Sequence, residues 1–425
     1  MPNLDEPPMS DSQPRAEAMP AKSLLIPTLL MIVFINFVGI GALIPILPYT
    51  VIDQLGYSEI VMTSLLASFS LAMFIGNPIL GRWSDKIGRK PVLMISLAVN
   101  AASHLVFAFS QDIVVLFGAR IVAGLAAGNI GVIQAIIADQ SRPEDRAKYM
   151  GFMGAFIGAG FVFGPAIGGL LSGIGGGPLH QAPFLLAGLF TLLALALCVR
   201  LPFMPLIQVE KAKDAQSGLQ RLASLMTGPL GLFAFAFFLL NLSFSQVEAS
   251  FVLVLKDLLA FDAQQTGWLF TYVGVCIIIV QGGLISPVVR KIGEMPTILM
   301  GVMLLTTGQF LTASFAAGYI LPAMPLLGLF IICTTIICTG FAFTNPTLSS
   351  VSSKIARKDE MGGALGLVQG FGSLGQVIGL TAAGPLYSLG GGGLSFGVGG
   401  LCCVCLLLIA IVITAKTKSS SRQAG

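Results

Sequence analysis

Two charged residues lie deep inside long apolar stretches of the chain. Arg120 occurs within residues 113–138, and Glu248 occurs within residues 229–255. A cation inside an apolar segment of membrane length is costly and normally faces a polar cavity, whereas a carboxyl in such surroundings can take up and release protons near neutral pH. The pair predicts proton coupling or substrate binding in a cavity. The alternatives are that Arg120 pairs with backbone carbonyls and that Glu248 is a structural residue or a residue of the cavity rim.

Uncharged polar side chains occur in several of the same stretches. Amide side chains donate and accept hydrogen bonds but can neither carry charge nor release a proton. We predict that the following amides line the cavity with Arg120 and Glu248: Asn36, Asn241, Gln246 and Gln134.

Long apolar helices must position these residues. The chain has 425 residues, of which 55% are hydrophobic and 10% are charged, whereas soluble domains carry roughly 25% charged residues. An apolar stretch of about 20 residues can cross a bilayer as a helix, and barrel strands alternate instead. We therefore predict an all-α membrane protein with twelve transmembrane helices in two six-helix pseudo-symmetric halves. The spans are 24–48, 61–81, 91–110, 113–138, 148–171, 184–200, 229–255, 264–287, 296–315, 322–346, 362–388 and 395–415.

The basic residues indicate the orientation. When the loops are assigned alternately to two sides, all 23 lysines and arginines except Lys256 and Arg120 fall on one side. Positively charged loops stay in the cytoplasm, so both termini are predicted to be cytoplasmic, in a plasma or inner membrane. The predicted organisation is a disordered tail (1–22), a six-helix half (23–200), a cytoplasmic linker (201–228), a second half (229–415) and a C-terminal tail (416–425).

The two halves retain an internal repeat. The segment KIGRKP at 86–91 recurs as KIGEMP at 291–296, 205 residues later. In later spans the offset is 215. At that offset, Gly151, Gly160, Gly164 and Gly169 correspond to Gly366, Gly375, Gly379 and Gly384. Internal repeats with a binding site between them are typical of secondary transporters.

A charged loop, GRWSDKIGRKP at 81–91, joins the second and third spans. Gly88 permits a sharp turn, and Asp85 can contact a neighbouring helix N-terminus or a cation. Asp139, at the inner end of the fourth span, is expected to contact the Arg89–Lys90 part of this loop. The loop could alternatively serve only as a positive anchor. The residues of this predicted cytoplasmic latch are Gly81, Asp85, Gly88, Arg89, Lys90 and Asp139.

The fifth span is rich in glycine at regular spacing. Small residues at helical spacing let two helices approach backbone to backbone, and a proline removes one helical hydrogen bond and bends the span. The residues of this glycine motif are Gly151, Gly160, Gly164, Pro165, Gly168 and Gly169.

The loop at 81–91 resembles the loop signature of the major facilitator superfamily. The spacing in the fifth span resembles the signature of the drug:proton antiporter branch, and FINFVGIGALIPILP in the first span resembles the tetracycline-efflux subgroup. The resemblance implies that Asp85 holds the halves together in the outward-open state and that the glycine motif seals the cavity against proton leak. Two departures stand out: Asn36 replaces an aspartate of the subgroup, and in the second repeat Arg290 stands where Asp85 would be.

The predicted function is therefore proton-driven export of a small amphipathic compound or drug by alternating access. The alternatives are an importer, uniporter or exporter of a metabolite or ion complex, and a membrane scaffold or sensor. The loop GxxxxGK[ST] is absent from the sequence, and the seven cysteines all fall inside spans, which favours an apolar packing role. We expect no enzymatic activity, no cofactor other than the coupling proton, no metal, no nucleic-acid partner and a functional monomer.

Overall fold

The computed structural model describes residues 22–141, 143–172, 174, 178, 180–201, 229–319, 325–355 and 361–423. Within these residues the regular structure is entirely helical. The predicted tail 1–22, except Lys22, and the predicted linker 201–228, except Leu201, lie outside the described residues.

The first half holds α1 (Lys22–Gly41), the π-helix η1 (Tyr49–Gln54), α2 (Glu59–Ile87), α3 (Arg89–Phe109), α4 (Ile113–Ala127), α5 (Ile130–Gln140), α6 (Pro143–Leu171) and α7 (Gln181–Val199). The second half holds α9 (Pro229–Leu259), α10 (Ala263–Ile279), the π-helix η2 (Val280–Leu284), α11 (Ile285–Ile292), α12 (Glu294–Ala316), α13 (Leu326–Ile355) and α14 (Met361–Gln423).

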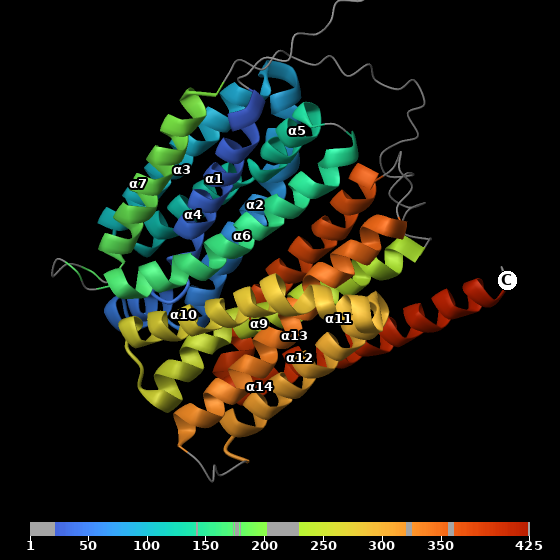
Figure 1. The fold of residues 1–425 in the computed structure, drawn as a ribbon. Coiled ribbons are helices and arrows are strands. Elements are labelled where there is room, and N and C mark those ends of the chain that lie inside the picture. Colours follow the sequence, from blue (N-terminus) through green and yellow to red (C-terminus); the bar gives the residue numbers. More distant parts are fainter. Residues whose placement is uncertain are drawn as a thin grey trace, which may run out of the picture.

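These elements form the twelve predicted spans. The fourth span consists of α4 and α5, and the eighth consists of α10, η2 and α11. The last helix, α14, is two spans that meet at a kink, where Gly391 has a φ of 60° that favours glycine. The final span continues to Gln423, so residues 416–423 of the predicted tail are helical. Figure 1 shows the halves as two bundles, blue to green and yellow to red.

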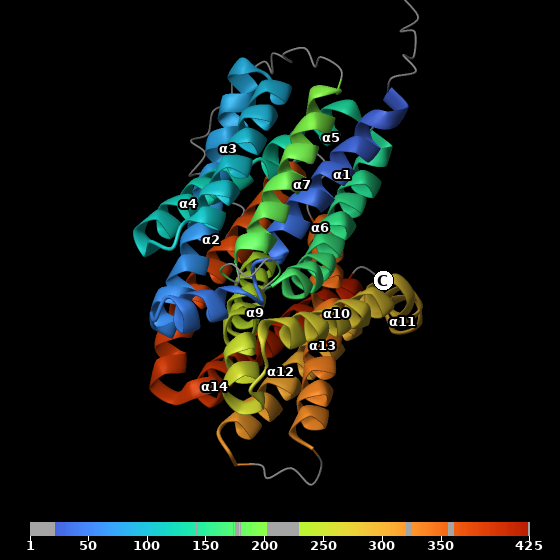
Figure 2. The same cartoon turned by 90° about the vertical axis from the view of Figure 1, so that its left-hand side faces the viewer.

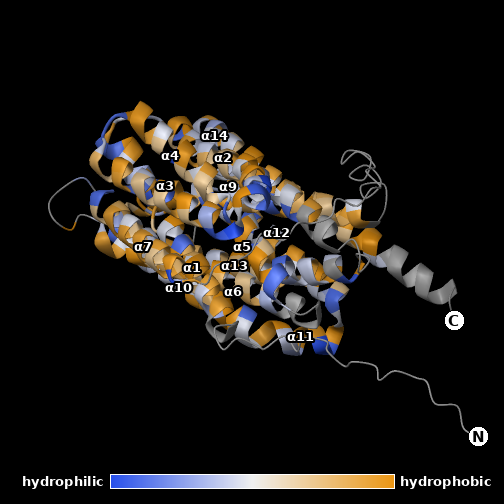
Figure 3. Ribbon diagram, turned by 90° about the horizontal axis from the view of Figure 1, so that it is seen from above, coloured by the Kyte–Doolittle hydropathy of each residue, from blue (hydrophilic) through white to orange (hydrophobic). Residues whose placement is uncertain are grey.

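The outer surfaces of the helices suit a bilayer. In Figure 3 most of the helical ribbon is hydrophobic and the hydrophilic residues form short patches. Large apolar side chains such as Val114 and Phe109 are 74% and 68% exposed. Helices satisfy their own backbone hydrogen bonds, which makes them suited to hydrocarbon surroundings. The chain is therefore an integral, multi-pass membrane protein.

The two ends of the bundle differ in how the halves meet. We call the end with the α2–α3 and α11–α12 junctions the basic end, and the end with η1 the opposite end. The halves contact each other through α2 with α14 and through α6 with α10 (Figure 2). One buried cluster contains residues of both halves, including Leu47 and Leu65 with Val247 and Phe251.

Polar contacts also join the halves at the opposite end. The Tyr49 hydroxyl donates to the carbonyl of Phe261 at 2.8 Å and lies 2.8 Å from Oγ1 of Thr266. Burial raises the pKa of Tyr49 to about 12, so the hydroxyl keeps its proton and remains a donor. Nearby, Lys256 of α9 forms an ion pair with Asp53 of η1. These contacts hold the opposite end closed.

At the basic end the halves are separate. Two further buried clusters lie there, one built only from the first half and the other only from η2, α11, α12 and α13 of the second half. A methyl group added to any of several glycines would meet no atom of the described residues within 4 Å. These glycines are Gly81, Gly151, Gly154, Gly282, Gly283 and Gly370. Among the described residues, the buried contact between the halves therefore lies toward the opposite end.

Candidate transport site

One face of α9 presents the candidate acid. Asn241, Phe244 and Glu248 follow one another at helical spacing, and each is half-buried, whereas Ser243, Gln246 and most of their other neighbours between 243 and 250 are buried. Residues three and four apart share a helix face, so the three form one accessible stripe. Glu248 Oε2 accepts a hydrogen bond from Nε2 of Gln376 on α14 at 3.5 Å. The stripe places a carboxyl at the deep end of an aromatic and amide surface.

The candidate cation lies on the other half. Arg120 of α4 is 3% exposed, and its guanidinium carbon lies 4.2 Å from the centroid of the Phe69 ring. Its Nε and Nη1 atoms are buried and have no hydrogen-bond partner among the described residues. Leaving a buried donor unpaired costs about 1–3 kcal/mol, and more for a charged group. Arg120 is therefore a charged group with unused donors.

Arg120 and Glu248 carry opposite charges and belong to different halves, on α4 and α9. They do not form a direct ion pair, because no nitrogen–oxygen contact within 4.0 Å joins them in the described part of the chain. The two charged residues that the sequence singled out thus lie on helices of different halves and are not directly paired.

Two predicted cavity amides lie elsewhere. Asn36 is 1% exposed, and its Oδ1 accepts from Nδ2 of Asn100 on α3 at 2.9 Å. Gln246, also 1% exposed, donates to the carbonyl of Gly379 at 2.9 Å and accepts from the hydroxyl of Ser395 at 3.1 Å. Both amides form their hydrogen bonds within their own half. A helix that is surrounded by other helices directs some of its polar side chains toward those neighbours. The structure therefore places neither on the accessible stripe of α9.

The other two predicted amides are more accessible. Asn241 is half-buried on the α9 stripe and donates to the carbonyl of Phe237 at 2.9 Å. Gln134 is half-buried on α5, toward the basic end of the fourth span.

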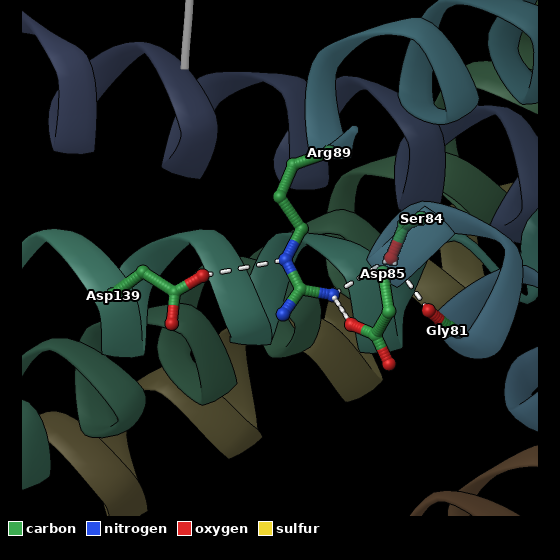
Figure 4. A network of polar contacts seen from close by, with 5 residues as sticks. All are labelled: Gly81, Ser84, Asp85, Arg89 and Asp139. Carbon is green, nitrogen blue, oxygen red and sulfur yellow. Dashed lines mark hydrogen bonds and ion pairs between the residues drawn. The ribbon is translucent and has the colours of Figure 1, made fainter. Parts of the chain in front are cut away.

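The predicted latch residues form a compact charge network at the basic end (Figure 4). Arg89 Nη1 lies 2.6 Å from Oδ1 of Asp85, and Arg89 Nε lies 3.3 Å from Oδ2 of Asp139, so the expected contact of Asp139 with the loop is present. Arg89 also donates to the hydroxyl of Ser84 at 2.7 Å. The side chain of Asp85 is 56% exposed. In this state Asp85 contacts its own half, and its contact with the second half remains a prediction for another state.

The neighbouring latch residues organise the turn. Gly88 has a φ of 104° and a ψ of 151°, which favour glycine, and it joins α2 to α3. Lys90 donates to the carbonyls of Val199 and Leu201 at 2.8 and 2.6 Å, at the C-terminus of α7. A cation at this position also suits the helix dipole. Gly81 lies beside open space at the basic end.

The second repeat carries a matching contact that the sequence reading missed. Glu294, which follows Arg89 by 205 residues, accepts from Lys354 Nζ at 2.8 Å and from the Ser350 hydroxyl at 2.6 Å. Lys354 in turn follows Asp139 by 215 residues. The two repeat offsets together could have revealed this pair, because both of its members occupy equivalent positions with their charges exchanged.

The glycine motif lets α6 approach α1 very closely. A Cβ on Gly164 would lie 2.7 Å from the carbonyl oxygen of Val38 and 2.8 Å from Cα of Gly41. Gly160 faces Phe37 of the same helix, and Gly168 faces Ala42, the residue that follows the helix. The remaining motif residues differ: Pro165 lies against Gly41, and Gly151 faces open space.

The last glycine of the motif contacts the other half. A Cβ on Gly169 would meet Gly267 and Ala263 of α10, and a Cβ on Gly267 would meet Gly169 at 2.6 Å. In the second half Gly375 and Gly379 face α9, whereas Gly384 faces Ile60 and Thr63 of α2. The repeated glycines therefore make equivalent contacts, two of them within each half and one between the halves.

The fold and this site define a class of protein, a two-bundle membrane transporter, and comparison with known proteins agrees. Residues 29–336 match the Major Facilitator Superfamily, and the chain belongs to that family. It is 29% identical to multidrug resistance protein 1 of Bacillus subtilis over 87% of this chain and 92% of that protein. It is also 29% identical to the class D tetracycline resistance protein of Salmonella ordonez, over 70% and 76% of the two chains. The predicted resemblance is thereby confirmed.

Solved structures support the fold independently. The crystal structure of the D-xylose–proton symporter matches with a TM-score of 0.75, at 18% identity, over 92% of this chain and 96% of that chain. At this identity the match concerns the fold alone.

Proposed function

We propose that this chain is a proton-coupled antiporter that exports a small amphipathic compound by alternating access. The observation that carries the proposal is the half-buried carboxyl of Glu248 on the accessible stripe of α9, where its one hydrogen bond within the described residues, from Gln376 of α14, is as long as 3.5 Å. Its similarity to proteins named for multidrug and tetracycline resistance supports export as the direction of transport. The protein acts as a transporter and not as an enzyme, as a monomer in the plasma or inner membrane.

The basic end faces the cytoplasm in this proposal, in keeping with the positive-inside rule. The described state then receives substrate from the cytoplasm while the contacts of Tyr49 and Asp53 close the external side. Substrate and proton compete for the site around Glu248. Bound substrate promotes release of the proton to the inside, and a proton taken up from outside promotes release of the substrate there.

Glu248→Gln tests the proposal, because the amide resembles the permanently protonated carboxyl. In proteoliposomes with an imposed pH gradient, the variant should lose gradient-driven accumulation while it keeps exchange of labelled substrate. Glu59→Gln is the matched control, since Glu59 lies in the first turn of α2 at the opposite end, and it should accumulate substrate normally.

Two outcomes would count against the proposal. If Glu248→Gln still accumulates substrate in proportion to the pH difference, Glu248 is not the coupling carboxyl. If the unmodified protein equilibrates substrate without any response to pH, it is a uniporter, which is the runner-up function.

A further inference from the structure

Close packing of α14 against α9 places a polar side chain next to Glu248. A Cβ on Gly375 or on Gly379 of α14 would collide with a backbone carbonyl oxygen of α9. Gln376 lies between these two glycines and is half-buried. Its Nε2 donates to Oε2 of Glu248 at 3.5 Å. An amide of α14 is therefore in contact with the carboxyl of α9.

The bond from Gln376 is the one hydrogen bond that the Glu248 carboxyl has among the described residues. Gln246, two residues earlier on α9, already binds Gly379 and Ser395. Burial disfavours the charged form of a carboxyl, whereas a donated hydrogen bond favours it. The amide of Gln376 thus acts against the effect of burial on Glu248.

Charged groups of the surrounding helices do not replace this contact. In the second half, α12, α13 and α14 pack against α9. Their charged residues occur only near helix ends: Glu294 begins α12, Lys354 is near the end of α13, and the others follow residue 415 of α14. On α9 itself, Lys256 and Asp257 lie about two turns beyond Glu248.

The described residues contain no ion pair to Glu248 within 4.0 Å, either from these groups or from Arg120 of the other half. The remaining titratable groups of α12, α13 and α14 are the thiols of Cys333, Cys338, Cys402, Cys403 and Cys405 and the hydroxyl of Tyr387. The amide of Gln376 is therefore the polar group best placed to tune the carboxyl.

We propose that Gln376 is a positioning residue, whose hydrogen bond to the Glu248 carboxyl sets the pH at which that carboxyl releases its proton. This inference rests on the proposed antiport, in which Glu248 is the coupling carboxyl. An amide donates to a carboxylate but carries no charge. It therefore favours release of the proton without holding the carboxylate as strongly as a cation would, and Glu248 can take up a proton again.

The contact is expected to persist through the transport cycle. Gln376 and Glu248 belong to the same half, and the glycine contacts hold their two helices together. Arg120 is on the other half and moves relative to Glu248 when the halves rock. The pH of proton release is thus a property of the second half, whichever side of the membrane the site faces.

Infrared titration of the reconstituted full-length protein measures the protonation of Glu248 directly. The carbonyl stretch of protonated carboxyls is recorded over a series of pH values, and the band that is missing from Glu248→Gln belongs to Glu248. Gln376→Met keeps a side chain of similar length but removes the donor, so the midpoint should move to higher pH by about one unit. This shift is a tenfold change in proton affinity, or about 1.4 kcal/mol.

Two further variants separate the hydrogen bond from packing. Gln376→Lys supplies a charged donor and should move the midpoint below that of the unmodified protein, whereas a packing defect would move both Gln376 variants the same way. Gln369→Met is the matched control, because Gln369 is exposed on the same helix two turns earlier. It should leave the midpoint unchanged.

Each Gln376 variant is decisive by itself, so the failure of one to fold leaves the other. A midpoint within about 0.3 pH units of the unmodified value in Gln376→Met, or one that does not fall in Gln376→Lys, would overturn the assignment. If Glu248→Gln nevertheless loses gradient-driven accumulation, antiport stands without it. If the midpoints shift as expected but Glu248→Gln still accumulates substrate in proportion to the pH difference, the antiport proposal fails, and the effect of Gln376 on the carboxyl stands by itself.

Discussion

The two halves use the same glycine packing but exchange the charges at their basic ends. Gly164 and Gly379 each approach the first span of their own half, at 2.7 Å from a backbone carbonyl oxygen to an added Cβ. In contrast, the pair Arg89–Asp139 of the first half becomes Glu294–Lys354 in the second. Close approach of two backbones requires glycine, because any side chain would be in the way. An ion pair can be formed with the acid on either helix, because the attraction depends only on the opposite signs of the two charges.

The largest expected effect concerns the glycine contacts, which both halves have. Gly164→Leu and Gly379→Leu should each reduce transport at least about tenfold, because overpacking at a closed helix contact costs about 1–3 kcal/mol or more. Even alanine is strained at these positions, since its Cβ would lie within 3 Å of backbone. Vesicle transport normalised to the amount of folded protein measures the effect.

Gly118→Leu is the control for these variants, because a Cβ there would meet nothing within 4 Å and the residue is exposed on α4. It should transport normally. A large effect of one repeat glycine and none of the other would show that the packing is not equivalent.

The next largest effect concerns the acid at the basic end, which the second half lacks. Asp85 has an ion pair with Arg89 at 2.6 Å, whereas Arg290, at the equivalent position, is exposed and has no ion pair among the described residues. Asp85→Asn should reduce the transport rate severalfold with little change in the amount of folded protein. Arg290→Gln should change the rate by less than about twofold, in the range of exposed charges.

Transport by Asp85→Asn at the unmodified rate would contradict the predicted latch. An Arg290→Gln defect as large as that of Asp85→Asn would show that both repeats work as latches.

Exchanging the charges within each pair tests their equivalence more finely. Glu294→Lys with Lys354→Glu should restore most of the transport that either single change removes. Arg89→Glu with Asp139→Lys should restore less, because Asp85 would then face a carboxylate in place of its cation. Transport rates of the single and double variants, compared as two cycles, give the coupling in each half. Equal recovery in both halves would mean that Asp85 is independent of Arg89.

The smallest effect concerns the ion pair between the halves. Partly exposed pairs contribute about 0–1 kcal/mol, so Lys256→Gln should shift the population toward opening at the opposite end by up to about fivefold. Spin-label distances between α2 and α14 at that end, in a background without native cysteines, measure the shift. Asp53→Asn should give the same shift, and the double variant no more. Additive shifts would show that the two residues act separately.

The sequence was sufficient for the spans and for the contact between Arg89 and Asp139, because hydropathy and the ends of neighbouring helices determine both. It was not sufficient to predict which way the side chains of Asn36 and Gln246 face. An amide in a helix can face a cavity or another helix, and the packing of the helices determines which. The Tyr49–Thr266 contact joins residues 217 positions apart, so only the docking of the halves reveals it. Lys256 could have been singled out from the sequence, because it was the one basic residue of a loop that was predicted on the side opposite all the others.

The contact between Gly169 and Gly267 has a mechanical consequence. Two glycines present no side chains that could interlock, so their helices can tilt against each other with little resistance. From Gly169 back to the start of α6 the helix extends about 26 residues, or about 39 Å at 1.5 Å per residue. A tilt of about 10° at this fulcrum would move the far end of that lever arm by about 7 Å. A small rotation at a bare backbone contact is thus amplified into a displacement comparable to the width of a small molecule.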